Sequence, residues 1–220
     1  MSTGKPTLAI IGGTGTLGSG LARRLAAAGY AVVIGSRAAD KADAAAKSIV
    51  AKAGAPRPRG ASNADAAKAG KVVLLAVPWG NHAAIIDEIR PYVAGKVVID
   101  TTVPLVPPKV ARVQLPPETS AALAAQKRLG DTVRVVAAFH NVAAHKLQSD
   151  ATIDCDVLVF GEDPKDRAVA VALAEAAGLR GVHAGPLANS VAGEALTSVL
   201  IGINRNYKVD GAGIRITGIG

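Results

Sequence analysis

Residues 7–18 read Thr7-Leu8-Ala9-Ile10-Ile11-Gly12-Gly13-Thr14-Gly15-Thr16-Leu17-Gly18, an apolar run followed by a glycine-rich turn. Apolar residues then recur at helical spacing, so the stretch predicts a strand, a tight turn and a helix. The spacing of Gly13, Gly15 and Gly18 is that of the dinucleotide fingerprint, in which glycines permit a tight turn and close approach of the backbone to a pyrophosphate. We therefore expect a nucleotide at this turn. A glycine-rich turn that binds nothing is the alternative.

The next apolar run, at residues 31–35, ends in Ser36 and Arg37, and Lys41 follows shortly after. A site for NAD usually has Asp or Glu at this place, where the carboxylate binds the ribose 2′-hydroxyl. A hydroxyl and two cations instead favour a 2′-phosphate, which Arg can bind through two hydrogen bonds. The sequence thus favours NADP over NAD. The other interpretation is that Arg37 and Lys41 belong to a solvated helix start.

Strand-like runs alternate with helical patterns, which is typical of a parallel α/β sheet. Strands are expected near residues 7–11, 31–35, 71–79, 96–102, 134–139, 154–161 and 179–184, with a short one within 55–60 and an edge strand around 214–216. Helices are expected near residues 16–28, 40–53 with Asp40 as N-cap, 62–69, 118–129, 164–177 and 190–204. We predict a Rossmann-type doubly wound parallel sheet in residues 1–140 and a small C-terminal cap domain in residues 141–220.

Parallel sheets bind ligands beyond the carboxyl ends of their strands. Ala76, Val77 and Pro78 end one expected strand, so we place them near the nicotinamide of the cofactor. His82 follows, either at the edge of the cofactor or as an ordinary residue of a helix start. His140 and His145 follow another strand end, but no carboxylate or cysteine stands at ligand spacing. We therefore expect no metal site.

Half of the 220 residues are hydrophobic, and the formal net charge is +8. Neither a block of Lys and Arg nor an aromatic stacking platform indicates nucleic acid, and anionic cofactors suit the same charge. The single cysteine, Cys155, lies in an apolar run and is expected to be a buried structural thiol. No apolar run reaches the ~18 residues of a membrane span, and the chain begins with a short polar stretch. We expect a soluble cytoplasmic protein with neither a nucleic-acid nor a membrane partner.

The chain resembles the NADPH-dependent reductases of the deazaflavin coenzyme F420 (F420H2:NADP oxidoreductases). The resemblance runs in order along nearly the whole chain. Its most specific segments are Gly12-Gly13-Thr14-Gly15-Thr16-Leu17-Gly18 and Gly185-Pro186-Leu187-Ala188-Asn189-Ser190. Further similar segments are Gly35-Ser36-Arg37, Ala76-Val77-Pro78-Trp79, Phe139-His140-Asn141-Val142-Ala143-Ala144 and Asn204-Arg205-Asn206-Tyr207. The segment after His140 lacks the proline of the family pattern, and residues 102–108 and 112–126 match less closely.

The resemblance implies a role for each matching residue. The pyrophosphate of NADP would lie against Thr14, Gly15, Thr16 and Leu17, and the 2′-phosphate against Ser36, Arg37 and Lys41. Val77 and Pro78 would line the nicotinamide, and Ala144 would approach it from the cap. His140 and Val142 would border the deazaflavin pocket.

The implied reaction is hydride transfer between C4 of the nicotinamide of NADP(H) and C5 of coenzyme F420. The cofactors carry the reactivity, so the protein mainly aligns two rings and excludes water. His140 is the candidate catalytic residue, or else a structural histidine at a strand end. Two alternatives stay open: an NADPH-dependent reductase of a flavin, carbonyl or imine, and a non-catalytic NADP-binding module. The long apolar helix 190–204 could pack against its copy in a homodimer or be buried within one chain.

Overall fold

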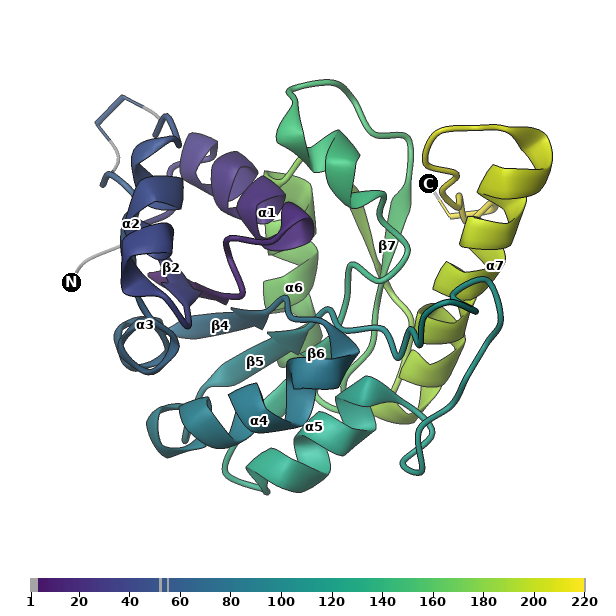
Figure 1. Ribbon diagram of the computed structural model, residues 1–220, viewed down its shortest axis with the longest axis horizontal. Coiled ribbons are helices and arrows are strands. Elements are labelled where there is room, and N and C mark those ends of the chain that lie inside the picture. The colour runs from purple at the N-terminus through teal and green to yellow at the C-terminus, as the bar shows by residue number, and fades with distance from the viewer. Residues whose placement is uncertain (1–3, 52, 55, 220) are drawn as a thin grey trace.

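A computed structural model describes residues 4–51, 53–54 and 56–219. Its main sheet has six parallel strands in the order β3-β2-β1-β4-β5-β6 (Figure 1). The strands are β1 (Leu8–Ile11), β2 (Val32–Ser36), β3 (Arg59–Ser62), β4 (Val72–Leu75), β5 (Val97–Asp100) and β6 (Arg134–Ala137). This order, with the reversal beside β1, is that of the Rossmann fold, and the predicted fold class is confirmed.

Helices cover both faces of the sheet because its strands are apolar on both faces. They are α1 (Thr16–Ala27), α2 (Ala39–Lys47), α3 (Asn63–Ala69), α4 (Trp79–Ile89), α5 (Ala121–Leu129), α6 (Pro164–Ala176) and α7 (Ser190–Tyr207). Leu8 and Ile10 of β1 pack into one core with residues of α1, α2 and α6. Ala9 and Ile11, which point the other way, pack into a second core with α3, α4 and α5. The alternation along β1 thus divides the interior between two helical layers.

The last third of the chain continues from the main sheet. A second sheet pairs β7 (Asp156–Val159) with β8 (Arg180–His183) in parallel. An isolated antiparallel bridge between Ala137 and Phe160 joins it to the end of β6. The long helix α7 then runs along this side of the molecule, and the C-terminus lies beside it (Figure 1).

Five expected elements differ from those observed. The helix expected over 40–53 ends at Lys47 with Ser48 as its C-cap, and only Ala42 and Ala46 on it are buried. The chain leaves the helix there, and Ile49 packs against the core from outside it. Its N-cap is Ala38 rather than Asp40. The third strand lies at 59–62 instead of within 55–60. Positions 52 and 55 of these expected segments lie outside the described residues.

Two further boundaries are set by capping and by proline. The strand expected over 71–79 leaves the ladder after Leu75, and Trp79 already begins α4 after Pro78. The helix expected from residue 118 begins at Ala121, because the Ser120 hydroxyl accepts the backbone N–H of Leu123 and caps the helix there. The edge strand expected at 214–216 does not form; this segment accepts one backbone hydrogen bond from Asp156, at Ile214.

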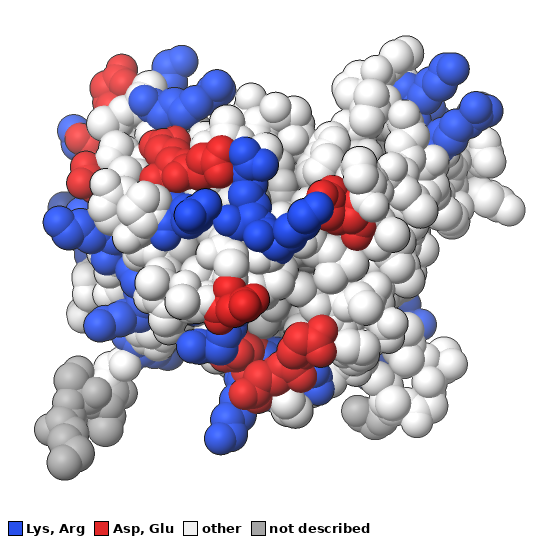
Figure 2. All heavy atoms as spheres, turned by 90° about the horizontal axis from the view of Figure 1, so that it is seen from below, with Lys and Arg blue, Asp and Glu red and all other residues white. Residues whose placement is uncertain are grey.

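On the face shown in Figure 2, acidic and basic side chains are interspersed mainly over the left and lower centre, and much of the rest is uncharged. Some pair across helices, as Arg128 of α5 does with Asp87 of α4 at 2.6 Å. Among the described residues, no helix has the length and apolar character needed to cross a membrane.

Candidate functional site

The glycine-rich turn between β1 and α1 brings backbone segments closer together than side chains would allow. Gly12 has a φ of +76°, and a Cβ added there would lie 2.3 Å from the carbonyl oxygen of Ala76. A Cβ on Gly18 would lie 2.6 Å from the carbonyl oxygen of Gly12. The turn therefore packs directly on the end of β4. The N-cap of α1 is Gly15, which has no capping side chain, so the first N–H groups of the helix are available to an anion.

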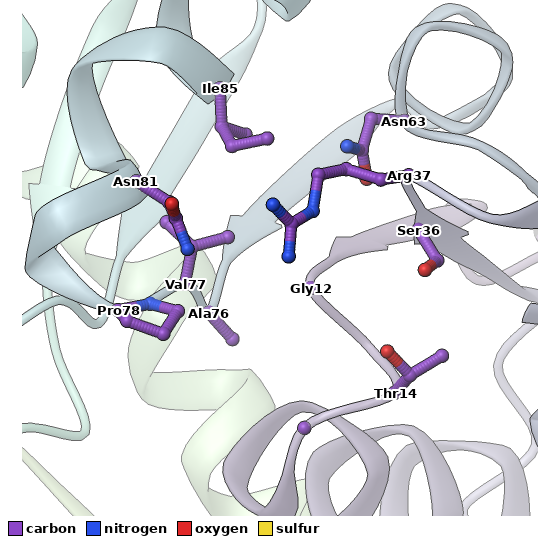
Figure 3. A pocket seen from close by; sticks show the side chains of 11 residues that line it. Gly12, Thr14, Ser36, Arg37, Asn63, Ala76, Val77, Pro78, Asn81 and Ile85 are labelled. Atoms are coloured by element: carbon purple, nitrogen blue, oxygen red, sulfur yellow. The ribbon is translucent and has the colours of Figure 1, made fainter. Parts of the chain in front are cut away.

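An open cavity of about 550 Å³ lies beside this turn (Figure 3). Thr14 and Gly15 border it from the turn, and Ser36 and Arg37 from the end of β2. The segment after β4 closes the opposite wall, with Ala76, Val77 and Pro78. These seven residues were expected at the cofactor, and the structure brings them to one cavity.

The other expected nucleotide residues do not line this cavity. Gly13 and Gly18 shape the turn, and Thr16 and Leu17 begin α1. Lys41 is an exposed residue of α2, five positions beyond the end of β2. Three residues of the lining were missed by sequence reasoning: Asn63, Asn81 and Ile85. Asn63 directly follows β3, so the rule that ligands lie beyond strand ends could have found it.

A second cavity, of about 350 Å³, lies where the chain leaves β6. Its walls come from residues 140–143, from α7 and from Ala212 of the tail. His140 and Val142 line it, whereas Ala144 begins the adjoining 3-10 turn, Ala144–Gln148. His140 and Val142 were expected at a second pocket, and they do share one.

His140 is buried, and Thr197 of α7 donates a hydrogen bond to its backbone carbonyl at 2.8 Å. Burial lowers the pKa of the His140 imidazole to about 4, although the nearby Asp100 opposes this shift. The ring is therefore neutral near pH 7. Its Nε2 has no hydrogen-bond partner within the described part of the chain.

Long-range contacts hold the segment that carries His140. The amide of Asn141 donates to the carbonyl of Asp156 at 2.7 Å and to Cys155 Sγ at 3.2 Å. Phe139 is buried and has a φ of +67°, a strained conformation that turns the chain sharply after β6. Burial also raises the pKa of the Cys155 thiol, which supports the structural role expected for it.

A buried hydrogen bond joins α4 to the end of β5. His82 Nε2 lies 2.7 Å from Asp100 Oδ2, and Asp100 Oδ1 accepts the backbone N–H of Thr102 at 2.9 Å. Burial alone would raise the pKa of Asp100, but His82 and these hydrogen bonds hold it below its usual range. Thr101 in turn donates to the carbonyl of Leu75 at 3.0 Å. His82 is thus engaged inside the fold. No group of three or more His, Cys, Asp or Glu able to hold a metal is found in residues 4–51, 53–54 and 56–219.

The strand order, the uncapped α1 and the cavity at the carboxyl edge define a Rossmann-type dinucleotide-binding protein. Comparisons narrow this class. Residues 7–104 match the family model described as NADP oxidoreductase, coenzyme F420-dependent. The F420-dependent NADP reductase of Methanocaldococcus jannaschii is 40% identical over 221 residues, which cover 96% of this chain and 98% of that protein. That of Methanothermobacter thermautotrophicus is 40% identical over 220 residues, covering 96% and 95%. The chain belongs to the F420-dependent NADP reductase family, a family of oxidoreductases.

The fold is also found in a solved structure. The crystal structure of an F420-dependent NADP reductase candidate from Arthrobacter sp. FB24 superposes with a TM-score of 0.77 at 24% identity, covering 97% of this chain and all of the other. At this identity the match supports the fold.

Proposed function

We propose that this protein transfers a hydride between NADP(H) and coenzyme F420. The observation that carries the proposal is the 40% identity to F420-dependent NADP reductases, which extends over 96% of the chain and so includes both cavities. Sequence identity limited to the predicted nucleotide domain, residues 1–140, would support only NADP binding.

In this proposal the first cavity holds NADP(H). The N–H groups at the start of α1 bind the pyrophosphate, together with Thr14, Gly15, Thr16 and Leu17. Ser36, Arg37 and Lys41 bind the 2′-phosphate, whose negative charge the two cations favour. The segment of Ala76, Val77 and Pro78 borders the nicotinamide.

The second cavity holds the deazaflavin ring, and Ala144 approaches the nicotinamide from the cap. The hydride chemistry belongs to the two coenzymes, and the protein aligns them and excludes water. Because His140 is neutral, it serves as a hydrogen-bonding group beside the deazaflavin rather than as a cation. Its unpaired Nε2 supports such a contact. A carbonyl or imine reductase would need a proton donor, and a histidine with a pKa of about 4 is a poor one near pH 7.

The test follows the absorbance of NADPH with purified enzyme and F420, without F420, and with FMN in place of F420. Rapid oxidation that requires F420 is expected. Equal oxidation with FMN, or none with F420 while NADPH still binds, would contradict the assigned acceptor. NADPH binding without turnover on any acceptor would favour a non-catalytic module.

Three wider features complete the proposal. Residues 141–220 act as the cap over the nucleotide domain of residues 1–140.

Two chains form a homodimer through α7, where Val199 is 48% exposed and the neighbouring segment presents Val113 and Leu115. Light scattering should then give twice the chain mass, and Val199→Lys should reduce it to the monomer mass. The protein works in the cytoplasm, where both coenzymes would be available, and cell fractionation tests this.

A further inference from the structure

Asn63 is a buried amide whose oxygen has no hydrogen-bond partner among residues 4–51, 53–54 and 56–219. It is the first residue of α3, which Ser62 caps by accepting the backbone N–H of Asp65. Its Nδ2 donates to Glu88 Oε2 on α4 at 3.1 Å. Because a carboxylate can only accept, this contact fixes which end of the amide is the nitrogen. The oxygen Oδ1 is therefore turned away from Glu88, and it has no hydrogen-bond partner in the described residues.

A buried carbonyl oxygen without a partner costs free energy, so an unpaired one in a native fold requires an explanation. Asn63 is only 2% exposed, yet it lines the first cavity. A ligand in that cavity could supply the missing donor. The site therefore fits a ligand that carries an N–H or O–H group at this end.

The position of Asn63 indicates which part of a dinucleotide it meets. In Figure 3, Asn63 and Ile85 lie at one end of the cavity and Thr14 lies at the other, with the Arg37 guanidinium between them. The turn at Thr14 takes the pyrophosphate, and the end of β2 takes the ribose phosphate. The remaining end, with the aliphatic Ile85 as a wall, suits a flat base.

We infer that Asn63 reads the adenine of NADP(H), with Oδ1 accepting a hydrogen bond from the exocyclic amine. The inference rests on the proposed NADP site. Arg37 is exposed and so is free to move towards the 2′-phosphate as the base enters. Glu88 is the positioning residue, since it orients the amide. A base with an oxygen in place of the amine would put two acceptors together and bind more weakly.

The test titrates NADPH and deamino-NADPH, in which hypoxanthine replaces adenine, by nicotinamide fluorescence with no electron acceptor present. We expect the wild type to bind NADPH about tenfold more tightly, in line with one hydrogen bond. Asn63→Leu should weaken NADPH binding about tenfold, leave deamino-NADPH nearly unchanged and bring the ratio of the two Kd values close to one. Asn81→Leu, the same change at the other asparagine of the cavity, should preserve the ratio.

Three results would overturn the inference: a wild-type ratio near one, an equal weakening of both nucleotides by Asn63→Leu, or loss of discrimination in Asn81→Leu. The thermal melting of the free variants checks folding. Asn63→Leu loses the hydrogen bond to the exposed Glu88 but also removes a buried acceptor that has no partner in the described residues, so its Tm should change little. Because no F420 is present, a failure here is separate from a failure of the F420 assignment. A wild type that binds neither nucleotide would instead refute the NADP site.

Discussion

The two cavities are held in different ways. The first is built by backbone geometry within β1, β2 and β4, which are neighbours in the sheet, and Gly12 and Gly18 permit the close approach. The second depends on side chains that are far apart in sequence, such as Asn141 with Asp156 and Thr197 with His140. The first cavity, to which we assign the nucleotide, is thus encoded in short motifs, and we call its surroundings the nucleotide half. The second, to which we assign the acceptor, exists only once the whole chain has folded, and we call its surroundings the acceptor half.

One side chain joins the two halves. Arg24 of α1 is buried, and its guanidinium donates to five backbone carbonyls, all at residues 146–151 and 177; the shortest, at 2.7 Å, are those of Ser149 and Ala151. Gln148 adds a hydrogen bond of 2.6 Å to the carbonyl of Thr16, at the start of the nucleotide-binding helix. The segment that follows Ala144 is therefore fastened to α1.

The largest effect is expected on the free energy of unfolding, in the variant Arg24→Met. Loss of the guanidinium removes a donor from the buried carbonyls of Leu147 and Ala177 and from three partly buried carbonyls. Each hydrogen bond is worth on the order of 1 kcal/mol, so the free energy of unfolding should fall by about 3 kcal/mol. Urea unfolding at pH 7.5 measures this. The control is Arg23→Met, because Arg23 makes a surface pair with the exposed Asp150 at 2.8 Å, worth about 0–1 kcal/mol. Equal losses in the two variants would mean that Arg24 does not join the halves.

The next largest effect is expected on coenzyme binding, when one glycine from each half is replaced by alanine. Gly12→Ala places a Cβ 2.3 Å from the Ala76 carbonyl oxygen at a φ of +76°, so the turn must move, at a cost of about 2 kcal/mol or more. NADPH binding should weaken at least tenfold.

In Gly193→Ala the Cβ would lie 2.6 Å from Cε2 of the buried Phe160 and 3.7 Å from Nδ1 of His140, which lines the second cavity. NADPH binding should therefore hardly change while F420 binding weakens. Fluorescence titration of NADPH and steady-state KM values for F420 measure the pair. If Gly193→Ala weakened NADPH as much as Gly12→Ala does, the two cavities would not be separable.

Arg37→Ala tests the charge of the nucleotide half. Loss of a charge-assisted bond to the 2′-phosphate should cost about 2 kcal/mol, which raises the KM for NADPH more than tenfold. The KM for NADH, which has no 2′-phosphate, should stay within about twofold. Steady-state kinetics with both coenzymes give the ratio. A parallel rise for NADH would show that Arg37 acts on a part common to both coenzymes.

The difference between local motifs at the first cavity and long-range contacts at the second also explains how much of the structure the sequence could predict. Glycine spacing and apolar runs predicted the Rossmann sheet and its nucleotide edge, because these depend on residues adjacent in sequence. The ends of α2 and β4 were wrong because they depend on tertiary packing: β4 leaves the ladder after Leu75, before the chain reaches Pro78. The contacts of Arg24 and the pairing of Asn63 with Glu88 could not be predicted, since no local pattern places such partners together.

The smallest effect concerns His140 in the acceptor half. Its pKa is about 4 in the folded protein, against an ordinary histidine pKa of 6.5, so the unfolded chain binds more protons between these values. Stability should therefore fall as the pH drops below 6.5, by about 1 kcal/mol between pH 7.5 and pH 5.5. Burial raises the pKa of Glu194 to about 8, against the hydrogen bonds from Ala121 and Ala122, and this stabilises the fold at lower pH instead.

Because Glu194 is present in both proteins, its contribution cancels when the wild type is compared with His140→Gln. Urea unfolding of each at pH 5.5 and pH 7.5 should show that the wild type loses about 1 kcal/mol more than the variant on acidification. Identical pH dependences would mean that His140 titrates normally in the folded state. The imidazole would then be open to solvent and able to donate a proton near pH 6.5. A carbonyl or imine would again be a candidate acceptor, because reduction of either needs a proton donor. The contrast between a buried acceptor half and an open nucleotide half would also disappear.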